Sequence, residues 1–255
     1  MKRETHESGA GNIFGNTLHD RRFTNDERGS GQLILVGTPI GNLGDVSQRA
    51  IETLKSADVI AAEDTRRTKI LLDRYGIRAP LTSYHSYNVK AKGPQLIDRI
   101  KAGEHVALVT DAGMPGISDP GTLLVRLAID AGVPVAAVPG PTAFVMALVL
   151  SGFPTHRFVF EGFLPIKSGA RRKRLQALTA DDRTLIFYES PHRLLPMLED
   201  VLAVFGDRAA SISRELTKQF EETIRGSLSM LIERFRRENP RGEFVVILSG
   251  NIVRK

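Results

Sequence analysis

Short apolar runs alternate with amphipathic stretches from Gly31 almost to the end of the chain, and this alternation constrains the fold more than any other feature. The runs are nearly continuous in apolar residues, as is typical of strands buried on both faces of a parallel sheet. Strands are expected at residues 33–36, 59–62, 81–84, 106–110, 135–138, 158–160, 184–188, 209–213 and 244–249. Strands that alternate with helices predict an α/β protein whose mostly parallel sheets are covered on both faces.

Helices are expected between these strands, and capping residues predict where several of them begin. Asp45 is expected to cap the first helix, with Gln48 three residues later completing a capping box. Asp64 or Thr65 is expected to cap the second helix, which would end near Gly76. The other helices are expected at residues 95–101, 123–131, 142–151, 171–178, 193–205 and 228–237.

A Pro-Gly-Pro break at residues 139–141 is the best candidate for a domain boundary. It predicts an N-terminal α/β domain over residues 31–140 and a C-terminal α/β domain over residues 141–255. Residues 1–30 are polar, rich in Gly and Asn, and without apolar periodicity, which predicts a disordered leader. We therefore expect two α/β domains of similar size after a short leader.

The composition excludes several classes of site and favours one class of partner. The chain has no cysteine, which excludes disulfides, thiolate zinc sites, iron–sulfur ligation and a cysteine nucleophile, and no metal site is expected. No apolar run approaches the roughly 20 residues of a membrane-spanning helix, and we expect a cytoplasmic protein. The net charge of +6 favours an acidic partner, of which nucleic acid is the usual one.

A first glycine-rich loop, residues 37–44, follows the first expected strand. It lacks the close glycine pair of the dinucleotide fingerprint and the Gly-Lys-Ser/Thr ending of a P-loop, so a tight strand-to-helix turn explains it equally well. Glu63 and Asp64 end the second strand, where nucleotide-binding folds place an acid against ribose, which leaves a nicotinamide-dependent oxidoreductase open. The alternative is that Asp64 only caps the helix that carries Arg66 and Arg67.

A second loop, residues 108–121, is much less ordinary. An apolar strand runs directly into a segment with three glycines, two prolines and two aspartates. Glycines let the backbone approach a ligand, prolines hold the loop in one shape, and aspartates bind an ammonium group or a ribose hydroxyl. Because polar loops at strand ends are more often functional than merely connecting, this loop predicts a binding site.

With this loop, the chain resembles the tetrapyrrole methylase superfamily and, more closely, the ribosomal RNA small-subunit methyltransferase I family of cytidine 2′-O-ribose methyltransferases. The matching strings run in order along nearly all of the chain after Gly31. They are Val-Gly-Thr-Pro-Ile-Gly-Asn-Leu at 36–43, Ala-Glu-Asp-Thr-Arg at 62–66, Val-Pro-Gly-Pro-Thr-Ala at 138–143, Glu-Gly-Phe-Leu-Pro at 161–165, Phe-Tyr-Glu-Ser-Pro-His-Arg-Leu at 187–194 and Arg-Glu-Leu-Thr-Lys at 214–218. Tetrapyrrole methylases share the architecture but lack the Glu-Asp-Thr-Arg and Tyr-Glu-Ser-Pro-His-Arg strings.

The resemblance implies two α/β domains of the tetrapyrrole methylase type, with S-adenosylmethionine in the cleft between them. It also implies 2′-O-methylation of a cytidine in 16S rRNA, free or within the small ribosomal subunit, by a homodimer. Carried over residue by residue, the cofactor contacts fall on Pro39, Asp111, Ala112, Gly113, Ser118, Asp119, Thr142, Ala143, Tyr188, Glu189, Gly242 and Glu243. Structural roles remain open for Tyr188 as a core aromatic and for Thr142 as a helix cap.

Methyl transfer to a ribose hydroxyl needs accurate positioning and a group that removes the hydroxyl proton. Asp64 is the leading catalytic candidate, because it ends a strand beside the expected cleft and belongs to a family-specific string. Glu189, Lys218 and His85 are the alternatives, and Asp64 itself could serve only to orient Arg66.

RNA contacts are expected mainly from cations, including the basic run at residues 171–174. The predicted RNA-binding residues are Arg66, Arg67, His85, Arg171, Arg172, Lys173, Arg174, Arg193 and Arg214. A solvated helix face is the alternative for the run, and a solvated loop histidine is the alternative for His85. Two other functions stay open on this scaffold: methylation of a small, tetrapyrrole-like molecule, and a ribosome-binding module that holds the cofactor without catalysis.

Overall fold

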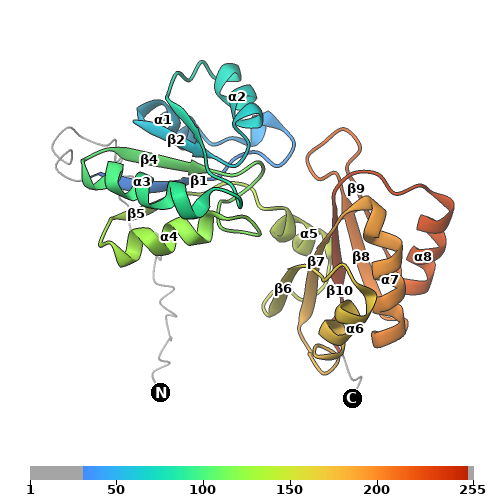
Figure 1. Ribbon diagram of the computed structural model, residues 1–255. Coiled ribbons are helices and arrows are strands. Elements are labelled where there is room, and N and C mark those ends of the chain that lie inside the picture. Colours follow the sequence, from blue (N-terminus) through green and yellow to red (C-terminus); the bar gives the residue numbers. More distant parts are fainter. Residues whose placement is uncertain (1–30, 252–255) are drawn as a thin grey trace, which may run out of the picture.

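Each half of the sequence forms one five-stranded sheet (Figure 1). The computed structural model describes residues 31–251, so the predicted leader at 1–30 lies outside the described residues. The first sheet has the order β3-β2-β4-β1-β5, and every neighbouring pair in it is parallel. Its strands are β1 (Gln32–Val36), β2 (Val59–Ala62), β3 (Leu81–Ser83), β4 (His105–Val109) and β5 (Val135–Val138). The predicted parallel sheet is confirmed for this half of the chain.

The second sheet is mixed, which differs from the prediction of a mostly parallel sheet. Its order is β6-β7-β10-β8-β9, and only β6 and β7 run parallel. Its strands are β6 (Phe158–Phe163), β7 (Thr184–Glu189), β8 (Ala209–Arg214), β9 (Glu222–Ser227) and β10 (Phe244–Leu248). The sequence did not predict β9, because this edge strand buries one apolar side chain, Ile224.

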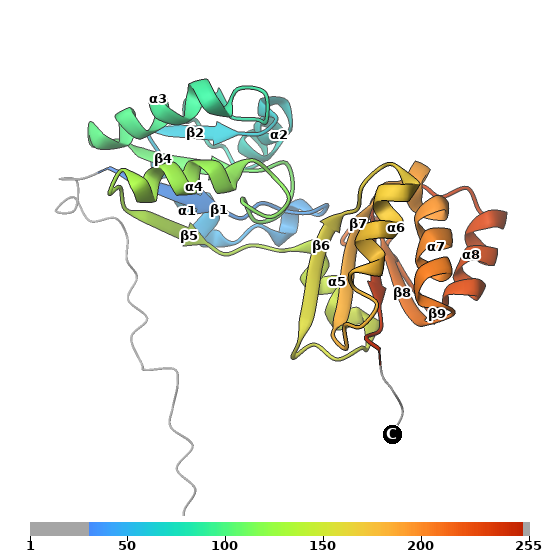
Figure 2. The same ribbon diagram turned by 60° about the horizontal axis from the view of Figure 1, so that its bottom comes forward.

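Helices cover both faces of the first sheet, so its strands are buried on both sides (Figure 2). Two of them, α1 (Gln48–Ser56) and α2 (Thr65–Arg74), pack on one face. The other two, α3 (Val89–Lys101) and α4 (Gly121–Asp130), pack on the opposite face.

The caps of the first two helices correct one prediction and confirm another. The N-cap of α1 is Ser47, whose Oγ accepts the Ala50 N–H, and Asp45 instead belongs to a short 3-10 turn, η2 (Leu43–Asp45). The predicted capping box is therefore wrong, because a turn intervenes before the helix. Asp64 caps α2 as predicted, since its Oδ1 accepts the Arg66 N–H at 2.9 Å.

The second sheet carries three helices on one face and one on the other. The three are α6 (Ser168–Gln176), α7 (Pro191–Phe205) and α8 (Leu228–Arg237), and they enclose the largest apolar cluster of the described residues. The single helix on the other face, α5 (Ala143–Ser151), packs with strands β7 and β10 and with Ile40 of the first half. This face therefore joins the two halves of the molecule.

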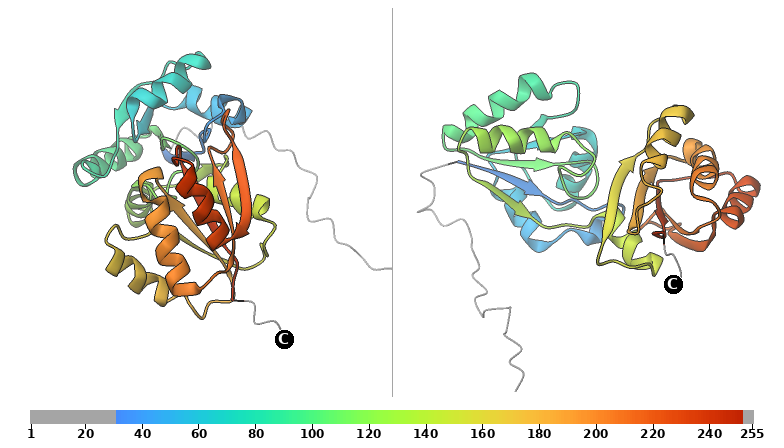
Figure 3. Two further views of the ribbon diagram at one scale, coloured as in Figure 1. Left: turned by 90° about the vertical axis from the view of Figure 1, so that its right-hand side faces the viewer. Right: turned by 90° about the horizontal axis from the view of Figure 1, so that it is seen from below.

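The two sheets lie side by side and are connected by the segment between β5 and α5 (Figure 3). The first sheet ends at Val138, and α5 begins at Ala143 and packs on the second sheet. These facts support our proposal of two domains divided at residues 140 and 141. No helix within residues 31–251 combines the length and the apolarity needed to cross a bilayer.

Candidate active site

A cavity of about 390 Å³ opens between the two halves, where the carboxyl ends of β1, β2 and β4 meet the second sheet. Its volume falls in the range of about 300–1,000 Å³ that is typical of small-molecule sites. The residues that line it are Ile40, Glu63, Arg67, Thr110, Asp111, Ala112, Gly113, Met114, Ile117, Ser118, Asp119, Thr142, Ala143, Phe163, Tyr188, Glu189, Ser190, Pro191, Leu216, Lys218, Glu243, Phe244 and Val245.

The loop that follows β4 forms the floor of the cavity and is held by backbone contacts. Thr38 and Gly113 form an antiparallel bridge, and Thr38 Oγ1 donates to the carbonyl oxygen of Thr110 at 3.1 Å. Gly113 has a φ of +90°, and a Cβ atom there would lie 3.2 Å from the carbonyl oxygen of Pro141. Only glycine combines this backbone angle with so close an approach, which explains its place in the loop.

Asp119 shapes the same loop from within. Its carboxylate accepts the backbone N–H groups of Gly116, Ile117 and Gly121 at 2.7–3.1 Å. Burial raises the pKa of Asp119 against the lowering effect of these hydrogen bonds. The carboxylate therefore fixes the loop, and only its remaining capacity is available to a ligand.

Acidic side chains make one wall of the cavity. Glu63 Oε2 accepts the Thr110 hydroxyl at 2.6 Å, and Asp111 Oδ1 accepts the Asp64 N–H at 2.9 Å. Burial and the neighbouring Glu63 raise the pKa of Asp111. Carboxylates that already repel one another favour a cationic ligand, which would relieve the repulsion.

Glu189 presents a buried acceptor that the described residues leave without a partner. Its side chain is fully buried, and Oε1 accepts the Ser190 N–H at 2.8 Å and lies 3.1 Å from Arg193 Nε. Oε2 is buried and has no hydrogen-bond partner among the described residues. Burial raises the pKa of Glu189 above its ordinary value. Because buried polar atoms are rarely left unpaired, this oxygen is a candidate acceptor for a proton or a hydrogen bond.

Lys218 stands on the opposite side as a charged group held between two acids. Its Nζ donates to Glu215 Oε1 at 3.0 Å and to Glu243 Oε2 at 2.9 Å. Partial burial alone would lower the pKa of Lys218, but the hydrogen bonds to Glu243 and Glu215 outweigh it and raise the pKa. The raised pKa favours the ammonium form of Lys218 at neutral pH.

The loop that carries Lys218 is strained. Glu215 and Thr217 have φ values of +49° and +67°, which non-glycine residues rarely adopt. Gly242 supports this loop: its φ is +93°, and a Cβ there would come within 2.5 Å of the Glu215 side chain. Gly242 thus makes room for Glu215, and backbone strain of this kind is concentrated at functional sites.

Tyr188 and Thr142 were the two cofactor candidates with open structural alternatives. The Tyr188 ring packs edge-to-face on Phe160 at 5.0 Å, its hydroxyl accepts the Phe144 N–H at 3.3 Å, and it also lines the cavity. Thr142 occupies the N-cap position of α5, but its side chain makes no capping hydrogen bond. Tyr188 therefore has both a core position and a cavity face, whereas the Thr142 hydroxyl is not used as a cap.

The structure brings most of the predicted cofactor residues together in one place. Pro39 and Gly242 do not line the cavity, and the other ten do: Asp111, Ala112, Gly113, Ser118, Asp119, Thr142, Ala143, Tyr188, Glu189 and Glu243. Sequence reasoning missed Glu63 as a lining residue, although it precedes Asp64 in the same string. Both acids lie in the bend between β2 and α2, where strand alternation no longer predicts which side chain faces the cavity.

Asp64 is the acid that turns away. It is not among the lining residues, and its carboxylate holds the Arg66 guanidinium at 2.8 and 3.1 Å while capping α2. The hydrogen bonds from Arg66 keep the pKa of Asp64 well below its usual range. A carboxylate this acidic is a poor proton acceptor, which favours the alternative role of capping α2 and orienting Arg66.

The predicted RNA-binding cations fall into exposed and enclosed groups. Arg66 and Arg67 have side chains that are 89% and 63% exposed. The Arg171 side chain is 5% exposed and lies 2.6 Å from Asp200. The prediction that the whole basic run faces RNA is therefore wrong for Arg171, because its guanidinium joins α6 to α7.

The other predicted RNA residues are spread over both halves. Lys173 is exposed, whereas Arg172 and Arg174 are half exposed and bind Asp200 and Glu161 respectively. The remaining three are mostly occupied within the protein. Arg193 donates to the Leu164 carbonyl, Arg214 pairs with Glu222, and His85 is half-buried beside Asn88.

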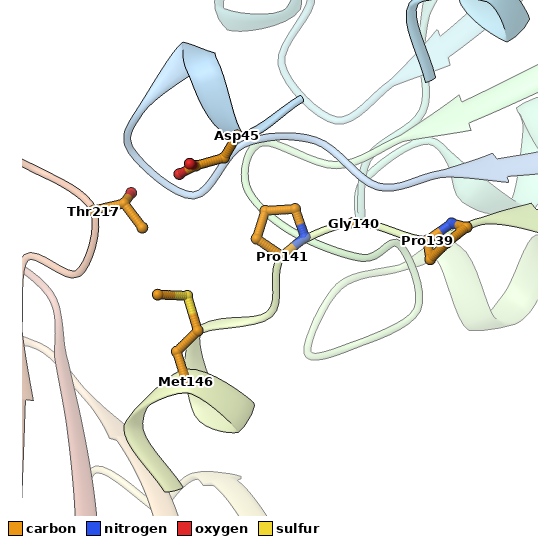
Figure 4. A pocket seen from close by; sticks show the side chains of 6 residues that line it. All are labelled: Asp45, Pro139, Gly140, Pro141, Met146 and Thr217. Carbon is orange, nitrogen blue, oxygen red and sulfur yellow. The ribbon is translucent and has the colours of Figure 1, made fainter. Parts of the chain in front are cut away.

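A second cavity of about 420 Å³ lies beside the linker between the halves (Figure 4). The figure shows its side chains coming from separate segments: Asp45 from the turn after β1, Pro141 from the linker, Met146 from α5 and Thr217 from the loop after β8. Asp45 is the one titratable residue among those that line this second cavity. The second cavity therefore lacks the acid cluster of the first cavity.

Comparison with solved structures identifies the fold. Uroporphyrin-III C-methyltransferase from Thermus thermophilus, complexed with S-adenyl homocysteine, matches with a TM-score of 0.61 and 21% identity, covering 88% of this chain and 99% of that one. The methyltransferase CobJ matches with a TM-score of 0.65 and 20% identity, covering 89% and 97%. Because the sequence identities are low, these matches are evidence for the fold alone. They establish the tetrapyrrole methylase fold and confirm the predicted fold class.

Sequence comparison is more specific. Residues 32–232 match the family model described as Tetrapyrrole (Corrin/Porphyrin) Methylases. Proteins named Ribosomal RNA small subunit methyltransferase I match at 48% identity in Thermotoga maritima, covering 86% of this chain and 99% of the relative, and at 52% in Halalkalibacterium halodurans, covering 87% and 76%. The resemblance inferred from the sequence strings is confirmed: this chain belongs to the ribosomal RNA small subunit methyltransferase I family, within the tetrapyrrole methylases.

Proposed function

We propose that this chain transfers the methyl group of S-adenosylmethionine to the 2′-hydroxyl of a cytidine ribose in 16S rRNA. The observation that carries the proposal is the identity of 48% over nearly the whole length of a relative named for the small-subunit RNA. The small-molecule alternative is supported less, because the matching uroporphyrin-III-C-methyltransferase and CobJ share only 22% and 20% identity with this chain.

The residues of the cavity fit this cofactor. S-adenosylmethionine supplies an electrophilic methyl group on a positively charged sulfonium. The acidic wall of Glu63, Asp111 and Asp119 favours a cation, and the unpaired Oε2 of Glu189 accepts a hydrogen bond from a polar group. Gly113 lets the loop backbone approach Pro141 and Ile40 closely at the floor of the cavity, and Tyr188 offers an apolar face. These residues, with Thr142 and Ala143, would hold the cofactor.

We assign the chemical roles among the three catalytic candidates by charge and position. Glu189 is the proton acceptor, because burial raises its pKa toward neutrality and the residue lines the cavity. Lys218 stays protonated and orients the ribose–phosphate of the substrate. Asp64 orients Arg66 at the rim, where the guanidinium can meet phosphate.

We also propose that the protein acts in the cytoplasm, where ribosomes are assembled, and as a homodimer. Exposed apolar side chains on neighbouring α5 and β6 support self-association: Val145, Val149 and Phe158 are 46%, 67% and 40% exposed. Sedimentation equilibrium tests the dimer, since Val149→Asp should shift the protein to a monomer if this face is the interface.

The proposed function is tested by following the label from radiolabelled S-adenosylmethionine. The protein is incubated separately with unmodified small ribosomal subunits, with naked 16S rRNA and with a porphyrin precursor. Label in either RNA sample supports the proposal and identifies the preferred form. Label only in the porphyrin supports the small-molecule alternative. Cofactor binding without transfer to any of the three supports a binding module.

A further inference from the structure

Tyr87 lies on the short loop between β3 and α3, and its side chain is 97% exposed. No function described above uses it. A fully exposed tyrosine is unusual, because its ring loses the benefit of burial, and the loop around it is otherwise well packed. Its neighbour Tyr84 is 1% exposed and anchors the loop in the core of the first half.

Hydrogen bonds hold the loop that carries the Tyr87 ring in one conformation. Asn88 Oδ1 accepts the His85 N–H at 2.9 Å, and Asn88 Nδ2 donates to the Ser83 carbonyl and hydroxyl at 3.2 and 3.1 Å. The half-buried His85 ring meets Tyr87 edge-to-face at 6.0 Å. One face of the tyrosine therefore stays open while its loop is fixed, so stacking on it would cost little conformational entropy.

Strand register places this loop along the edge that leads to the cavity. Ser83 pairs with Ala62 in the parallel β2–β3 ladder, and the Tyr84 N–H donates to the Ala62 carbonyl at 2.7 Å. Residues 85–87 therefore leave the edge strand β3 at the same end of the sheet at which Asp64 follows β2. The Asp64 N–H in turn donates to Asp111 Oδ1 at 2.9 Å, and Asp111 lines the cavity.

The charge along this edge is positive. Both α2 and α3 begin here, and neither has an acidic residue in its first turn. Arg66 and Arg67 occupy the first turn of α2, and the exposed Lys90 occupies the first turn of α3. Asp64 binds Arg66 at 2.8 Å and Asp111 lies 3.7 Å from Arg67, yet the two arginine side chains stay 89% and 63% exposed, so both guanidinium groups can still meet a phosphate.

We propose that Tyr87 is a stacking platform for a base of single-stranded RNA that flanks the nucleotide entering the cavity. Arg66 and Arg67 would bind the intervening phosphates, and the ring would stack on the base, as aromatic side chains do in single-strand recognition. The inference rests on the proposed function and names a contact for its substrate. The flanking cations favour RNA over an apolar protein partner at this surface.

The test compares Tyr87→Ala, Tyr87→Trp and the control Ile129→Ala, which removes an apolar side chain that is 60% exposed on α4. Fluorescence anisotropy measures binding of a labelled single-stranded RNA with the sequence of the methylated region. Loss of stacking predicts affinity about 5- to 150-fold weaker for Tyr87→Ala. The salt dependence should be unchanged, because no phosphate contact is lost. Tyr87→Trp should restore binding, and Ile129→Ala should leave it unchanged.

Calorimetry with the cofactor and sedimentation accompany each variant. RNA affinity of Tyr87→Ala equal to that of the wild type overturns the inference and leaves the proposed function standing. A change of oligomeric state in Tyr87→Ala without weaker RNA binding assigns the ring to a protein interface and also overturns it. If the wild type binds this RNA through Tyr87 but transfers no label to it, the proposed function fails and the platform stands.

Discussion

Glu189 and Asp64 both belong to sequence strings that are typical of the family, yet their surroundings shift their pKa values in opposite directions. Burial raises the pKa of Glu189, and the hydrogen bonds from Arg66 lower the pKa of Asp64. We expect Glu189→Gln to lower single-turnover methylation by roughly 10²–10⁴-fold, the usual contribution of a general base. Asp64→Asn should retain nearly normal turnover, because asparagine also caps a helix. Rapid-quench measurement at saturating RNA and cofactor separates chemistry from binding. The reverse ranking of the two variants would return the catalytic role to Asp64.

The raised pKa of Glu189 also predicts the pH dependence of the reaction. A base acts when ionised, and Glu189 is ionised only above a pKa that burial raises beyond the ordinary 4.5. Single-turnover rates should therefore fall as the pH drops through this raised pKa. The fall should begin at a higher pH than it would for a glutamate with an ordinary pKa. The acid limb should be absent from the residual activity of Glu189→Gln. A wild-type rate that stays flat down to pH values near 4.5 would contradict the assignment.

Gly113 allows a direct test of the cavity floor with a matched control. Gly113 and Gly103 have φ values of +90° and +98°, but a Cβ at Gly103 meets nothing within 4 Å. Both alanine variants should lose about 1–2 kcal/mol of stability from the strained backbone angle. Only Gly113→Ala should also weaken cofactor binding, which calorimetry measures. Equal affinities in the two variants would show that the ligand does not approach Gly113.

Single residues were predictable from the sequence where they belong to a family motif or where the backbone requires glycine. Asp111, Gly113 and Tyr188 line the cavity as expected. Glu63 was not predictable, because it lies in the bend after β2, where the sequence pattern does not determine which of two adjacent acids faces the cavity. Gly242 was assigned to the cofactor, but its role in the structure is to accommodate Glu215.

At the level of elements, helix α6 shows how a basic run can be divided by helical geometry. Arg171 and Leu175 are four residues apart and both are buried, whereas Lys173 lies on the exposed side. Residues four apart on a helix lie on the same face, so Leu175 predicts that Arg171 lies on the buried side. The four cations of the run therefore do not form one surface. Helix α3 and strand β9 were harder to predict: α3 begins at Val89 rather than at residue 95 and contains Pro94, and β9 buries a single apolar side chain.

The buried Arg171–Asp200 pair predicts a stability effect that an RNA contact does not. Arg171→Ala leaves the buried Asp200 carboxylate with Ser168 and Arg172, and should lower the free energy of unfolding by roughly 3 kcal/mol. Lys173→Ala should change it by less than about 0.5 kcal/mol. Urea denaturation checks both values. In RNA binding, Lys173→Ala should reduce the salt slope, and a stable Arg171→Ala protein with a reduced slope would contradict our placement of Arg171.

Both halves of the molecule line the cavity that we propose as the active site. The first sheet contributes the acidic wall and the glycine loop, and the second contributes Glu189, Tyr188 and Lys218. The sequence predicted this division through its Pro-Gly-Pro linker and its paired strings, but it did not predict the mixed second sheet. Strand β10 is a continuous apolar run like the parallel strands of the first sheet, yet it pairs antiparallel with both β7 and β8, so periodicity alone does not reveal strand direction.

The central claim is that the methyl group is placed on a ribose oxygen of the small-subunit RNA. Alkaline hydrolysis tests this most directly, because cleavage of RNA requires a free 2′-hydroxyl. After transfer from the radiolabelled cofactor to 16S rRNA, complete alkaline digestion should leave the label in a single dinucleotide that resists cleavage and begins with cytidine. Label that appears only in mononucleotides would place the methyl group on a base and would contradict the account.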